Sequence, residues 1–463
     1  MKTKDGMKTV CIQGLGFVGS AMAIVVALAR DETGPKFNVI GIDLPNKYGR
    51  QRVDSINQGI FPFKTSDKDL SSSLAAVCKQ GNLKATINPS IYSQADVIIV
   101  DINMDISYLD DQPQLDVHAL KKAIQEIGYY VLPETLILIE TTVPPGTCEK
   151  IIAPTLFTEL QKRGIKPDSI YLAHSYERVM PGKNYLKSIT DYPRVFSGLT
   201  EESADVCEQF LSEVLNVKKC PLTRLSSTTA SETAKVMENT YRAVNIAFID
   251  EWTKYAEAVG IDLFEIIHAI KQRPTHSNIR FPGLGVGGYC LTKDPTFTPA
   301  SAKELFDIQL DFPFSKLAVQ TNNAMPLHTV ARLKILLGNN LSEKKILICG
   351  VTYRQDVADT RYSASEILGR ELLALGANIT CHDPYIKFWE EMKINVLQKL
   401  PKVSDYHAIV MAVAHQDYKK LEPIHWAEAP LLLDANMVFD NQQIKKYREI
   451  GINIESIGRG NGL

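Results

Sequence analysis

The fold is decided near the N-terminus by Thr9-Val10-Cys11-Ile12-Gln13-Gly14-Leu15-Gly16-Phe17-Val18-Gly19, which leads into the Ala-, Val- and Leu-rich run Ser20 to Arg30. Residues 9–13 are predicted to form a short buried strand and residues 20–30 a helix. The glycines between them permit a tight turn, a close approach of pyrophosphate and close packing of the helix on the strand. The stretch therefore predicts the first βαβ unit of a parallel sheet, with a dinucleotide at the N-terminus of its helix.

An acid at the end of the next predicted strand, Val39 to Asp43, indicates which dinucleotide is bound. Such an acid bonds the adenosine ribose hydroxyls and favours NAD over its phosphorylated form. Its separation from the glycines exceeds the usual ~20 residues, which the polar insert Asp31 to Asn38 explains. Lys47 and Arg50 leave NADP open, and a glycine turn that binds no dinucleotide is the alternative. The predicted cofactor contacts here are Gly14, Gly16, Phe17, Val18, Gly19 and Asp43.

The rest of the chain alternates apolar runs with helical patterns, as parallel α/β domains do. Residues 227–259 lack Pro and Gly and predict one helix far longer than the average of about eleven residues. Strand and helix patterns then restart near Lys345. We expect an α/β protein in which a helical central domain with one long helix joins two Rossmann-like parallel-sheet domains. The predicted domains are residues 1–220, 221–328 and 329–463.

Composition describes an ordinary globular chain of 463 residues with a net charge of -2, which gives no indication of a nucleic-acid partner. The eight cysteines are scattered without Cys-x-x-Cys or zinc-site spacing, so we expect reduced thiols, a cytoplasmic location and no metal. Lys2, Lys4 and Lys8 precede an apolar run in the manner of a secretory signal, but the glycines interrupt that run. No stretch approaches the ~20 apolar residues of a membrane span.

A second glycine-rich run, Gly283-Leu284-Gly285-Val286-Gly287-Gly288-Tyr289-Cys290-Leu291-Thr292-Lys293-Asp294-Pro295, indicates the chemistry. Glycines let the backbone approach a ligand closely, and a nearby cation favours the reactive thiolate. Cys290 is therefore a candidate covalent nucleophile. Together with the dinucleotide loop, it suggests a thiol-assisted, nicotinamide-dependent oxidation.

Polar residues on the long helix recur at steps of three, four and three and so share one face: Glu232, Lys235, Asn239 and Arg242. A lysine and an amide can together hold a developing alkoxide, although a solvated charged stripe is the alternative. Thr142, at the end of the predicted strand 135–142, is a further candidate for the cofactor site. It can equally cap the helix that follows.

The sequence resembles the nucleotide-sugar dehydrogenase family, which includes UDP-glucose and GDP-mannose dehydrogenases and their N-acetylhexosamine relatives. The resemblance extends over nearly the whole chain. Its motifs are Gly14 to Gly19, Thr141 to Gly146, Ser175-Tyr176-Glu177-Arg178-Val179-Met180-Pro181-Gly182, Glu232 to Asn239, Gly287 to Cys290 with Lys293 and Asp294, Gly350 to Tyr353, and Asp359 to Ser363.

This resemblance implies a four-electron oxidation of the C6 alcohol of a UDP-sugar to a carboxylate, with two NAD molecules reduced in turn. Cys290 matches the family's cysteine, which carries a thiohemiacetal and then a thioester. Lys235 and Asn239 match the oxyanion-stabilising residues, and Asp294 matches the acid that assists water or proton transfer. Thr142 and Glu177 match positions of the first domain that complete the site.

By the same resemblance the C-terminal domain holds the nucleotide, and the long helix builds a homodimer. An arginine that often arrives from the partner subunit matches Arg361, for which an exposed surface role is the alternative. Lys293 is assigned to the cofactor or to a phosphate. The substrate-binding candidates are Arg178, Lys235, Asn239, Arg242, Arg280, Gly287, Tyr353 and Arg361.

Two departures from the family pattern bear on function. Tyr176 replaces the proline of Ser-Pro-Glu, and the segment at Asp101 lacks a common Pro-containing turn. Pro181 stands where the glucose and mannose branches carry a glutamate, which favours a UDP-N-acetylhexosamine over UDP-glucose. An inactive nucleotide-sugar-binding scaffold and a two-electron hydroxyacid or 6-phosphogluconate-type dehydrogenase are the competing functions.

Overall fold

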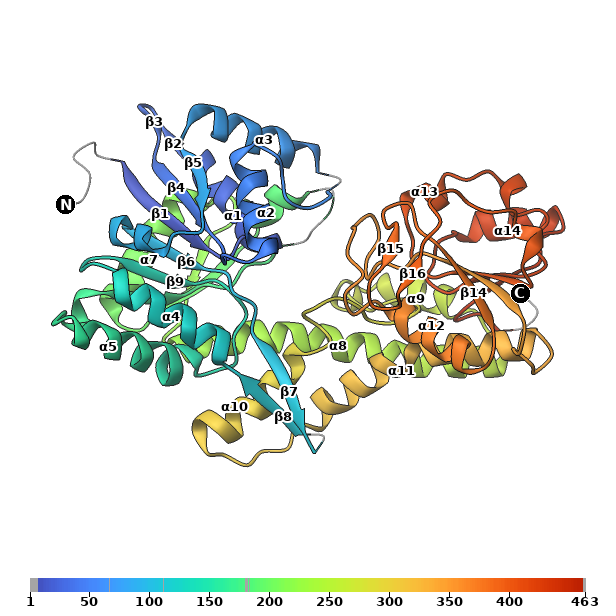
Figure 1. The fold of residues 1–463 in the computed structure, drawn as a ribbon. Coiled ribbons are helices and arrows are strands. Elements are labelled where there is room, and N and C mark those ends of the chain that lie inside the picture. Colours follow the sequence, from blue (N-terminus) through green and yellow to red (C-terminus); the bar gives the residue numbers. More distant parts are fainter. Residues whose placement is uncertain (1–6, 66, 111, 180–181, 183, 461–463) are drawn as a thin grey trace. The chain divides into compact units, whose positions relative to one another are not determined.

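The computed structural model describes residues 7–65, 67–110, 112–179, 182 and 184–460. The chain forms two compact units (Figure 1). The first comprises Met1–Glu238 with Thr296–Asp311, and the second comprises Asn239–Pro295 with Phe312–Leu463. The long helix α8 (Thr228–Val259) begins in the first unit and ends in the second. The sequence-based division into three domains stays a prediction.

The first unit is built on an eight-stranded sheet in the order β12-β11-β10-β9-β6-β1-β4-β5. All neighbours are parallel except β10 and β11. Because β1 pairs with β4 on one side and β6 on the other, the chain reverses its winding there, where α/β folds bind ligands. The strands are β1 (Lys8–Gln13), β4 (Phe37–Ile42), β5 (Leu83–Thr86), β6 (Val97–Val100), β9 (Leu136–Ile139), β10 (Tyr171–His174), β11 (Arg194–Gly198) and β12 (Leu222–Arg224).

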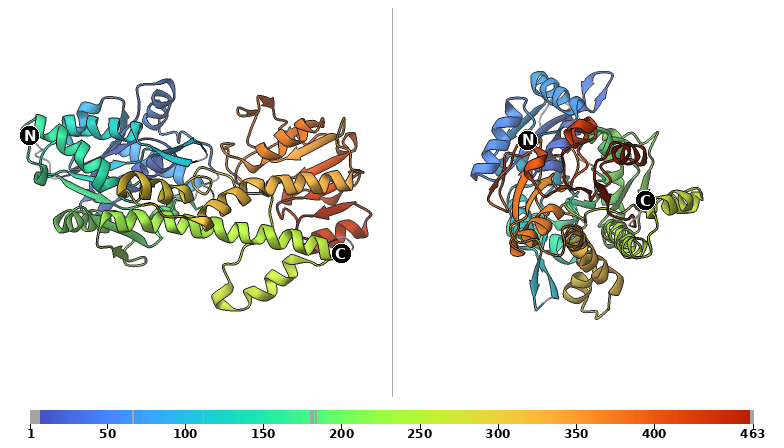
Figure 2. Two further views of the ribbon diagram at one scale, coloured as in Figure 1. Left: turned by 90° about the horizontal axis from the view of Figure 1, so that it is seen from below. Right: turned by 90° about the vertical axis from the view of Figure 1, so that its right-hand side faces the viewer.

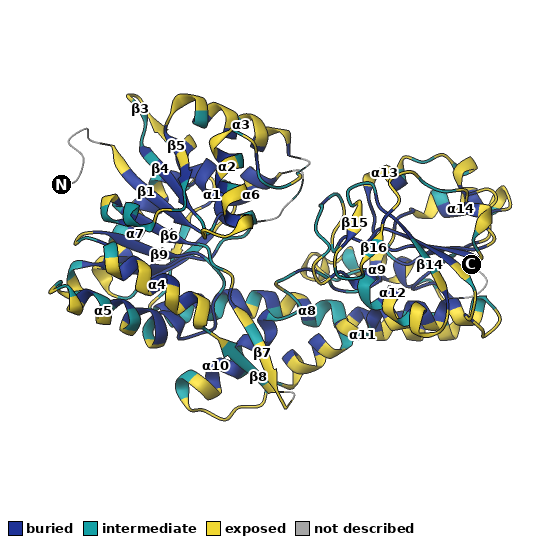
Figure 3. Ribbon diagram, in the orientation of Figure 1, coloured by how far each residue is buried: buried dark blue, intermediate teal, exposed yellow. Residues whose placement is uncertain are grey.

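Helices cover both faces of this sheet (Figure 2), and each face has its own apolar core. Successive side chains of a strand point to opposite faces, so Val10 and Ile12 of β1 join one core and Cys11 the other. The sheet is therefore buried on both sides (Figure 3). The helices of this unit are α1 (Phe17–Leu28), α2 (Lys47–Asn57), α3 (Lys68–Gln80), α4 (His118–Tyr130), α5 (Ala153–Lys162), α6 (Tyr185–Thr190), α7 (Glu201–Val214) and α10 (Phe297–Phe306).

Three local features of the first unit differ from the sequence-based expectation. Helix α1 begins at Phe17, directly after Gly16, three residues earlier than predicted. The polar insert contains a small antiparallel pair, β2 (Arg30–Asp31) and β3 (Gly34–Pro35), and a second hairpin, β7 (Asp105–Leu109) and β8 (Gln112–Asp116), was not predicted. It is anchored by the Leu115 N–H, which donates to Glu304 Oε1 of α10 at 3.0 Å.

The second unit is built on a five-stranded parallel sheet in the order β14-β13-β17-β18-β19. It also has one apolar core on each face, which confirms the predicted α/β fold class with two Rossmann-like sheets. Its elements are α9 (Leu263–Lys271), α11 (Pro313–Leu336), β13 (Lys345–Cys349), α12 (Ala364–Ala374), β14 (Asn378–His382), β15 (Phe388–Trp389), β16 (Ile394–Asn395), β17 (Ala408–Met411), α13 (Gln416–Lys419), β18 (Leu432–Asp434), α14 (Asn441–Glu449) and β19 (Ile454–Ser456).

Helix α8 confirms the long helix expected between residues 227 and 259. Strong helix formers and the absence of Pro and Gly explain why it continues over 32 residues. Among the helices in the described ranges, this one included, none has both the length and the apolar character that a bilayer span requires.

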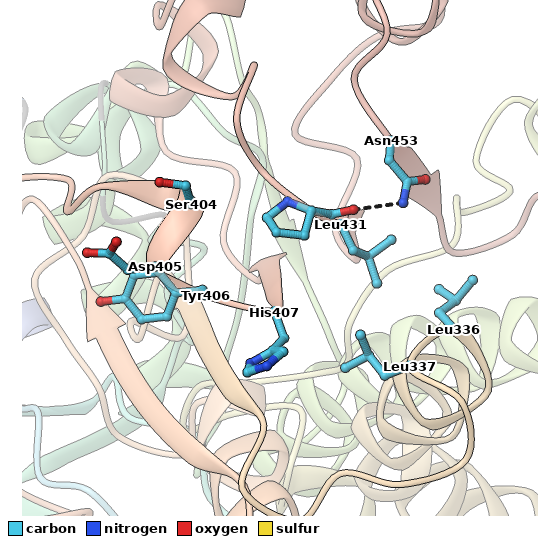
Figure 4. Close-up of a pocket in the computed structure, with 9 residues that line it drawn as sticks. Leu336, Leu337, Ser404, Asp405, Tyr406, His407, Leu431 and Asn453 are labelled. Carbon is cyan, nitrogen blue, oxygen red and sulfur yellow. Dashed lines mark hydrogen bonds between the residues drawn. The ribbon is translucent and has the colours of Figure 1, made fainter.

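A shallow cavity of about 390 Å³ lies in the second unit, where His407 precedes β17 and Leu431 precedes β18 (Figure 4). Leu336, Leu337 and the aromatic ring of Tyr406 line it together with polar groups. Asn453 Nδ2 closes one side by donating to the Pro430 carbonyl oxygen at 2.8 Å. The cavity is thus at the amino ends of these parallel strands, whereas ligands of such sheets gather at the carboxyl ends.

Candidate functional site

The glycine loop after β1 divides into structural and accessible positions. Gly14 adopts φ +93°, and a methyl group added there would lie 2.4 Å from the Asp101 carbonyl oxygen. A methyl group on Gly19 would lie 2.0 Å from the Gly14 carbonyl oxygen. A methyl group on Gly16 would meet no atom within 4 Å. Gly14 and Gly19 are thus required by the packing, while the space over Gly16, at the start of α1, is open for a pyrophosphate.

Asp43 links this loop to the second strand. It follows β4, and its carboxylate accepts from the Leu15 N–H at 3.2 Å and the Leu44 N–H at 2.7 Å. Arg52 Nη1, which sequence analysis missed, lies 3.1 Å from Asp43 Oδ2. Arg50, which left NADP open, instead donates from Nε to the Pro45 carbonyl oxygen. The loop, the helix start and the acid have the arrangement that a dinucleotide requires, so these residues fit NAD.

Aromatic rings cover the start of α1. The Phe17 ring stacks on Phe63 with centroids 4.1 Å apart, and the Tyr185 hydroxyl donates to the Phe17 carbonyl oxygen at 2.5 Å. The Arg52 guanidinium lies 5.7 Å from the Phe63 ring centroid. Phe17, a predicted cofactor contact, is therefore held by its neighbours, and Val18 beside it is half-buried.

Glu232 resolves the alternative role of Thr142. Its carboxylate accepts from the Gly146 N–H at 2.6 Å and the Cys148 N–H at 2.8 Å. It thereby caps the helical segment that starts at Cys148, so the cap proposed for Thr142 is wrong. Thr142 is half-buried after β9. Burial raises the pKa of Glu232 to about 8, and this residue is structural rather than part of a solvated stripe.

Lys235 is buried on α8 and contacts the segment after β10. Its Nζ donates to the Glu177 carbonyl oxygen at 2.8 Å and lies 4.0 Å from Glu177 Oε1. The same ammonium lies 5.3 Å from the Tyr176 ring centroid. Arg178 lies against the other residues of this group, with Nη2 3.1 Å from Glu238 Oε2. The first unit thus brings together three residues that the sequence analysis named as site candidates, Lys235, Glu177 and Arg178.

Two buried carboxyl groups stand at the carboxyl ends of β6 and β9. Glu140 pairs with Arg194 at 2.8 Å, and both side chains are almost fully excluded from solvent. Burial, and then the neighbouring Glu140, hold the pKa of Asp101 well above its usual range. The raised pKa favours the protonated form of Asp101, which reduces the negative charge that Arg194 balances.

In the second unit, the cysteine loop forms a compact cluster with the N-terminal part of its α8 segment. The buried Asp294 carboxylate accepts from Asn239 Nδ2 at 2.7 Å and from Lys293 Nζ at 3.2 Å. The Asp294 N–H donates to the Cys290 carbonyl oxygen at 2.8 Å. The Lys293 ammonium also lies 4.3 Å from the Tyr289 ring centroid. Four predicted site residues, Cys290, Asn239, Lys293 and Asp294, therefore lie together.

Cys290 differs from the other cysteines in exposure. It is open to solvent, Cys78 is half-buried, and the remaining six are buried. Burial raises the pKa of the Cys11 and Cys381 thiols to about 12 and holds that of Cys148 well above its usual range. Because the thiolate is the nucleophile, the buried thiols are poor candidates for chemistry. Cys290 is the exposed thiol at a glycine-rich loop.

The glycines before Cys290 pack on the loop after β13. A methyl group on Gly287 would lie 2.8 Å from the Tyr362 carbonyl oxygen, and one on Gly288 would lie 2.7 Å from the Tyr353 ring. Burial, and then Asp359, raise the pKa of Tyr353 to about 12. The Arg361 guanidinium is forked onto Asp359, with Nη2 to Oδ2 at 2.7 Å.

Two predicted substrate-binding residues lie outside the contacts described above. Arg242 is exposed on α8, and Arg280 is half-buried in the segment that precedes the glycine-rich run. The assignments of all the candidate residues to cofactor or substrate stay predictions.

Comparison with known families covers most of the chain. Residues 8–216 match the NAD binding domain, residues 229–324 the central domain and residues 347–446 the UDP binding domain of the UDP-glucose/GDP-mannose dehydrogenase family.

Individual relatives match nearly end to end. A UDP-N-acetyl-D-mannosamine dehydrogenase of Methanocaldococcus jannaschii is 33% identical over 99% of this chain and 98% of its own length. The solved structure of a UDP-D-ManNAc dehydrogenase from Pyrococcus horikoshii has 26% identity and a TM-score of 0.83, covering 98% of this chain and 100% of that one. That of an NDP-N-acetyl-D-galactosaminuronic acid dehydrogenase from Methanosarcina mazei has 28% identity and a TM-score of 0.78, covering 98% and 96%.

Proposed function

The chain belongs to the UDP-glucose/GDP-mannose dehydrogenase family, and from this premise we propose that it oxidises the C6 alcohol of a UDP-N-acetylhexosamine to a carboxylate. It is an oxidoreductase that uses NAD. The proposal depends above all on one observation, the exposed Cys290 beside Asn239, Lys293 and Asp294.

Cys290 is proposed to hold the substrate carbon through the second half of the reaction. NAD, when bound, accepts the hydride that leaves the carbon at each of the two oxidations. The Cys290 thiolate adds to the aldehyde carbon, and the carbonyl oxygen takes up a proton to give a thiohemiacetal. Loss of that proton and the second hydride leaves a thioester. Water then adds to the thioester carbon, the carbon–sulfur bond breaks, and the acid and free thiol are released.

Lys235 and Asn239 are proposed to stabilise the negative oxygen that develops in these steps. Both are nearly excluded from solvent and stand one turn apart on α8. Asn239 uses one N–H on Asp294, which fixes its amide and leaves the second N–H for an oxyanion. Removing one donor of this kind typically costs about 2.7–4 kcal/mol of transition-state stabilisation. Asp294 is proposed to assist the attacking water, and Glu177 and Thr142 to complete the site.

NAD binding is proposed for the glycine loop of the first unit. Open space over Gly16 and the positive end of α1 suit the pyrophosphate, and Asp43 suits the adenosine ribose. Arg52 holds Asp43 in place and adds a cation to the same corner. The UDP moiety is proposed to bind the second unit, with Tyr353 and Arg361 as contacts and Arg178, Arg242, Arg280, Gly287 and Lys293 as further candidates.

The N-acetylated sugar is favoured by the relatives. The Methanocaldococcus jannaschii and Methanosarcina mazei proteins carry names of dehydrogenases of N-acetylated nucleotide sugars. UDP-glucose is the second candidate, because contacts within a pocket, and not the fold, decide between such sugars.

A homodimer through α8 is supported by an apolar stripe on that helix. Steps of seven, four, three and four residues place Tyr241, Phe248, Trp252, Tyr255 and Val259 on one face, and all five are exposed. Exposed aromatic rows of this kind mark protein interfaces. We expect Trp252→Glu to convert a dimer to a monomer, measured by light scattering after gel filtration, whereas Glu251→Gln should leave the mass unchanged.

The function is tested by counting NADH formed per sugar consumed, with NAD and a panel of UDP-hexoses and UDP-N-acetylhexosamines. Two NADH per sugar and a uronic acid from an N-acetylhexosamine support the proposal. One NADH per sugar would indicate a two-electron dehydrogenase, and none over the whole panel an inactive binding scaffold. A uronic acid from UDP-glucose alone would correct the sugar and keep the mechanism.

A further inference from the structure

Tyr176 stands where the family resemblance leads one to expect proline, in the segment that follows β10. Tyr176 is only 2% exposed. Its ring contacts two candidate site residues, Lys235 and Arg178, and it precedes a third, Glu177, in the sequence. A proline ring has no aromatic face, so the substitution changes what this position can contact.

Two cations share the Tyr176 ring. The Lys235 ammonium lies 5.3 Å and the Arg178 guanidinium carbon 5.6 Å from the ring centroid. Both distances are within the range at which an aromatic face attracts a cation, and burial strengthens such contacts. One ring therefore contacts both the proposed oxyanion donor and a proposed substrate-binding arginine.

The hydroxyl end of the ring is tied to the same helix as Lys235. Arg178 Nη2 lies 3.4 Å from the Tyr176 hydroxyl and 3.1 Å from Glu238 Oε2. The Tyr176 hydroxyl also donates to Glu238 Oε2 at 3.5 Å. Because Lys235 and Glu238 are three residues apart on α8, they lie on one face of it. Arg178 and Glu238 thus hold the Tyr176 ring in place, and the ring in turn contacts the Lys235 ammonium.

The geometry points to Tyr176 as a positioning residue, whose ring fixes the Lys235 ammonium against the Glu177 carbonyl oxygen so that it is placed in advance for the developing oxyanion. A lysine side chain is long and flexible, and donors contribute most when no reorganisation is needed during the reaction. This inference rests on the proposed function, because it assigns Lys235 the oxyanion role given above.

Variants at this position separate the ring from the hydroxyl and from general packing. Tyr176→Phe keeps the ring, Tyr176→Leu removes it, and Tyr92→Leu is the matched control. Tyr92 is likewise fully buried in the first unit but belongs to the core beneath β6 and β9. Two readouts are measured: kcat and KM with NAD and the UDP-sugar, and the rate at which an acylating reagent modifies Lys235, mapped by peptide mass spectrometry.

We expect Tyr176→Leu to lower kcat about tenfold, to leave the KM for NAD within twofold, and to speed the labelling of Lys235 at least threefold. Tyr176→Phe should stay within twofold of wild type in both readouts, and Tyr92→Leu should not alter the labelling of Lys235. Unchanged labelling in Tyr176→Leu, or equal changes in Tyr176→Phe or Tyr92→Leu, would overturn the inference. A wild type that oxidises no sugar would instead overturn the proposed function, while the labelling still decides the role of Tyr176.

Discussion

The glycine turns after β1 and β13 can be compared bond by bond. Gly14 has φ +93° and its N–H donates to the Ile42 carbonyl oxygen, while Gly350 has φ +102° and donates to that of His382, each at 2.8 Å. The next N–H in each turn reaches an aspartate after the neighbouring strand, at 3.2 Å for Leu15 with Asp43 and 2.9 Å for Val351 with Asp383. The two sheets begin with the same hydrogen-bonded turn.

The turns differ in what surrounds them. After Gly14 the chain enters α1 at once, with open space over Gly16, and Asp43 pairs with a half-exposed arginine. After Gly350 a longer loop precedes α12, and the buried Asp383 is bonded to His415 Nε2 at 3.1 Å. In the first turn, the N-terminus of α1 and Asp43 remain accessible to a dinucleotide. In the second turn, Asp383 is buried against His415, so only the side chains of the loop remain to contact a ligand. We therefore predict that the two turns, although alike in hydrogen bonding, belong to two different ligand sites.

The largest expected effect concerns Cys290 of the second unit. Cys290→Ser should lower uronic acid formation by about 10³-fold or more, because an alcohol is a far weaker nucleophile than a thiolate. NAD affinity, assigned to the first unit, should stay unchanged. The measurement is product yield by chromatography together with NAD titration. Cys78→Ser is the control, and full uronate yield in Cys290→Ser would remove this residue from the mechanism.

Substituting alanine for the glycines of the two turns, Gly14, Gly16 and Gly350, should distinguish positions required for stability from the position that leaves space for a ligand. A methyl group on Gly350 would lie 2.4 Å from Val413 Cβ and the residue has positive φ, so Gly350→Ala should cost about 3 kcal/mol of unfolding free energy, and Gly14→Ala a similar amount. Gly16→Ala should change stability by no more than about 0.5 kcal/mol but weaken NAD binding about tenfold, since the methyl group would fill the pyrophosphate space. Denaturant titrations and NAD titrations measure both. Equal stability loss in all three variants would remove the distinction.

His174, at the end of β10, makes the stability of the first unit depend on pH. Burial lowers the pKa of His174 from 6.5 to about 3. Between pH 3 and pH 6.5 this histidine is therefore protonated in the unfolded chain but neutral in the folded one. Stability from this group is complete above about pH 6.5 and is lost as the pH falls toward 3, which predicts a loss of about 2 kcal/mol between pH 7 and 5. Urea unfolding measures it, and His174→Asn should flatten the dependence. A stability that rises on acidification in wild type but not in the variant would contradict the assignment.

The smallest effect tests the two aspartates against each other. Asp43→Asn should weaken NAD binding about three- to tenfold, as expected for one ribose hydrogen bond, and leave UDP binding unchanged. Asp383→Asn should leave NAD binding unchanged. Calorimetric titrations with NAD and with UDP decide it, and loss of NAD affinity in Asp383→Asn would contradict the separation of the two turns.

Sequence patterns predicted the first turn better than the second for a physical reason. Gly14, Gly16 and Gly19 have the spacing of a dinucleotide-binding turn, in which the first and last glycine are required by packing and the middle one leaves space for the ligand. Gly350 has no glycine nearby in the sequence, so no such spacing identifies its turn. The long helix could be predicted because its residues favour helix without outside support. Hairpin β7–β8 is largely exposed and polar, so its sequence has little periodic apolar character.

Within the candidate site, the sequence identified several of the residues but not the side-chain contacts that they make. Cys290 and Asp294 stood out through their neighbours in sequence, but Arg52 and Glu232 act on groups far from them along the chain. Glu232 was expected on a charged face and instead caps a helix start through two backbone N–H groups, a contact that only tertiary structure creates. Tyr176 was noted in the sequence as a departure from the family pattern, but its contacts with the Lys235 and Arg178 cations are visible only in the folded structure.

The central claim, that Cys290 carries the sugar as a thioester, is tested by stopping the reaction with acid during turnover and mapping the protein by peptide mass spectrometry. We predict a uronyl adduct on the peptide that contains Cys290, with none on the other seven cysteines and none in Cys290→Ser. Uronic acid accumulating while the Cys290 peptide stays unmodified, or an adduct on another cysteine, would contradict the account.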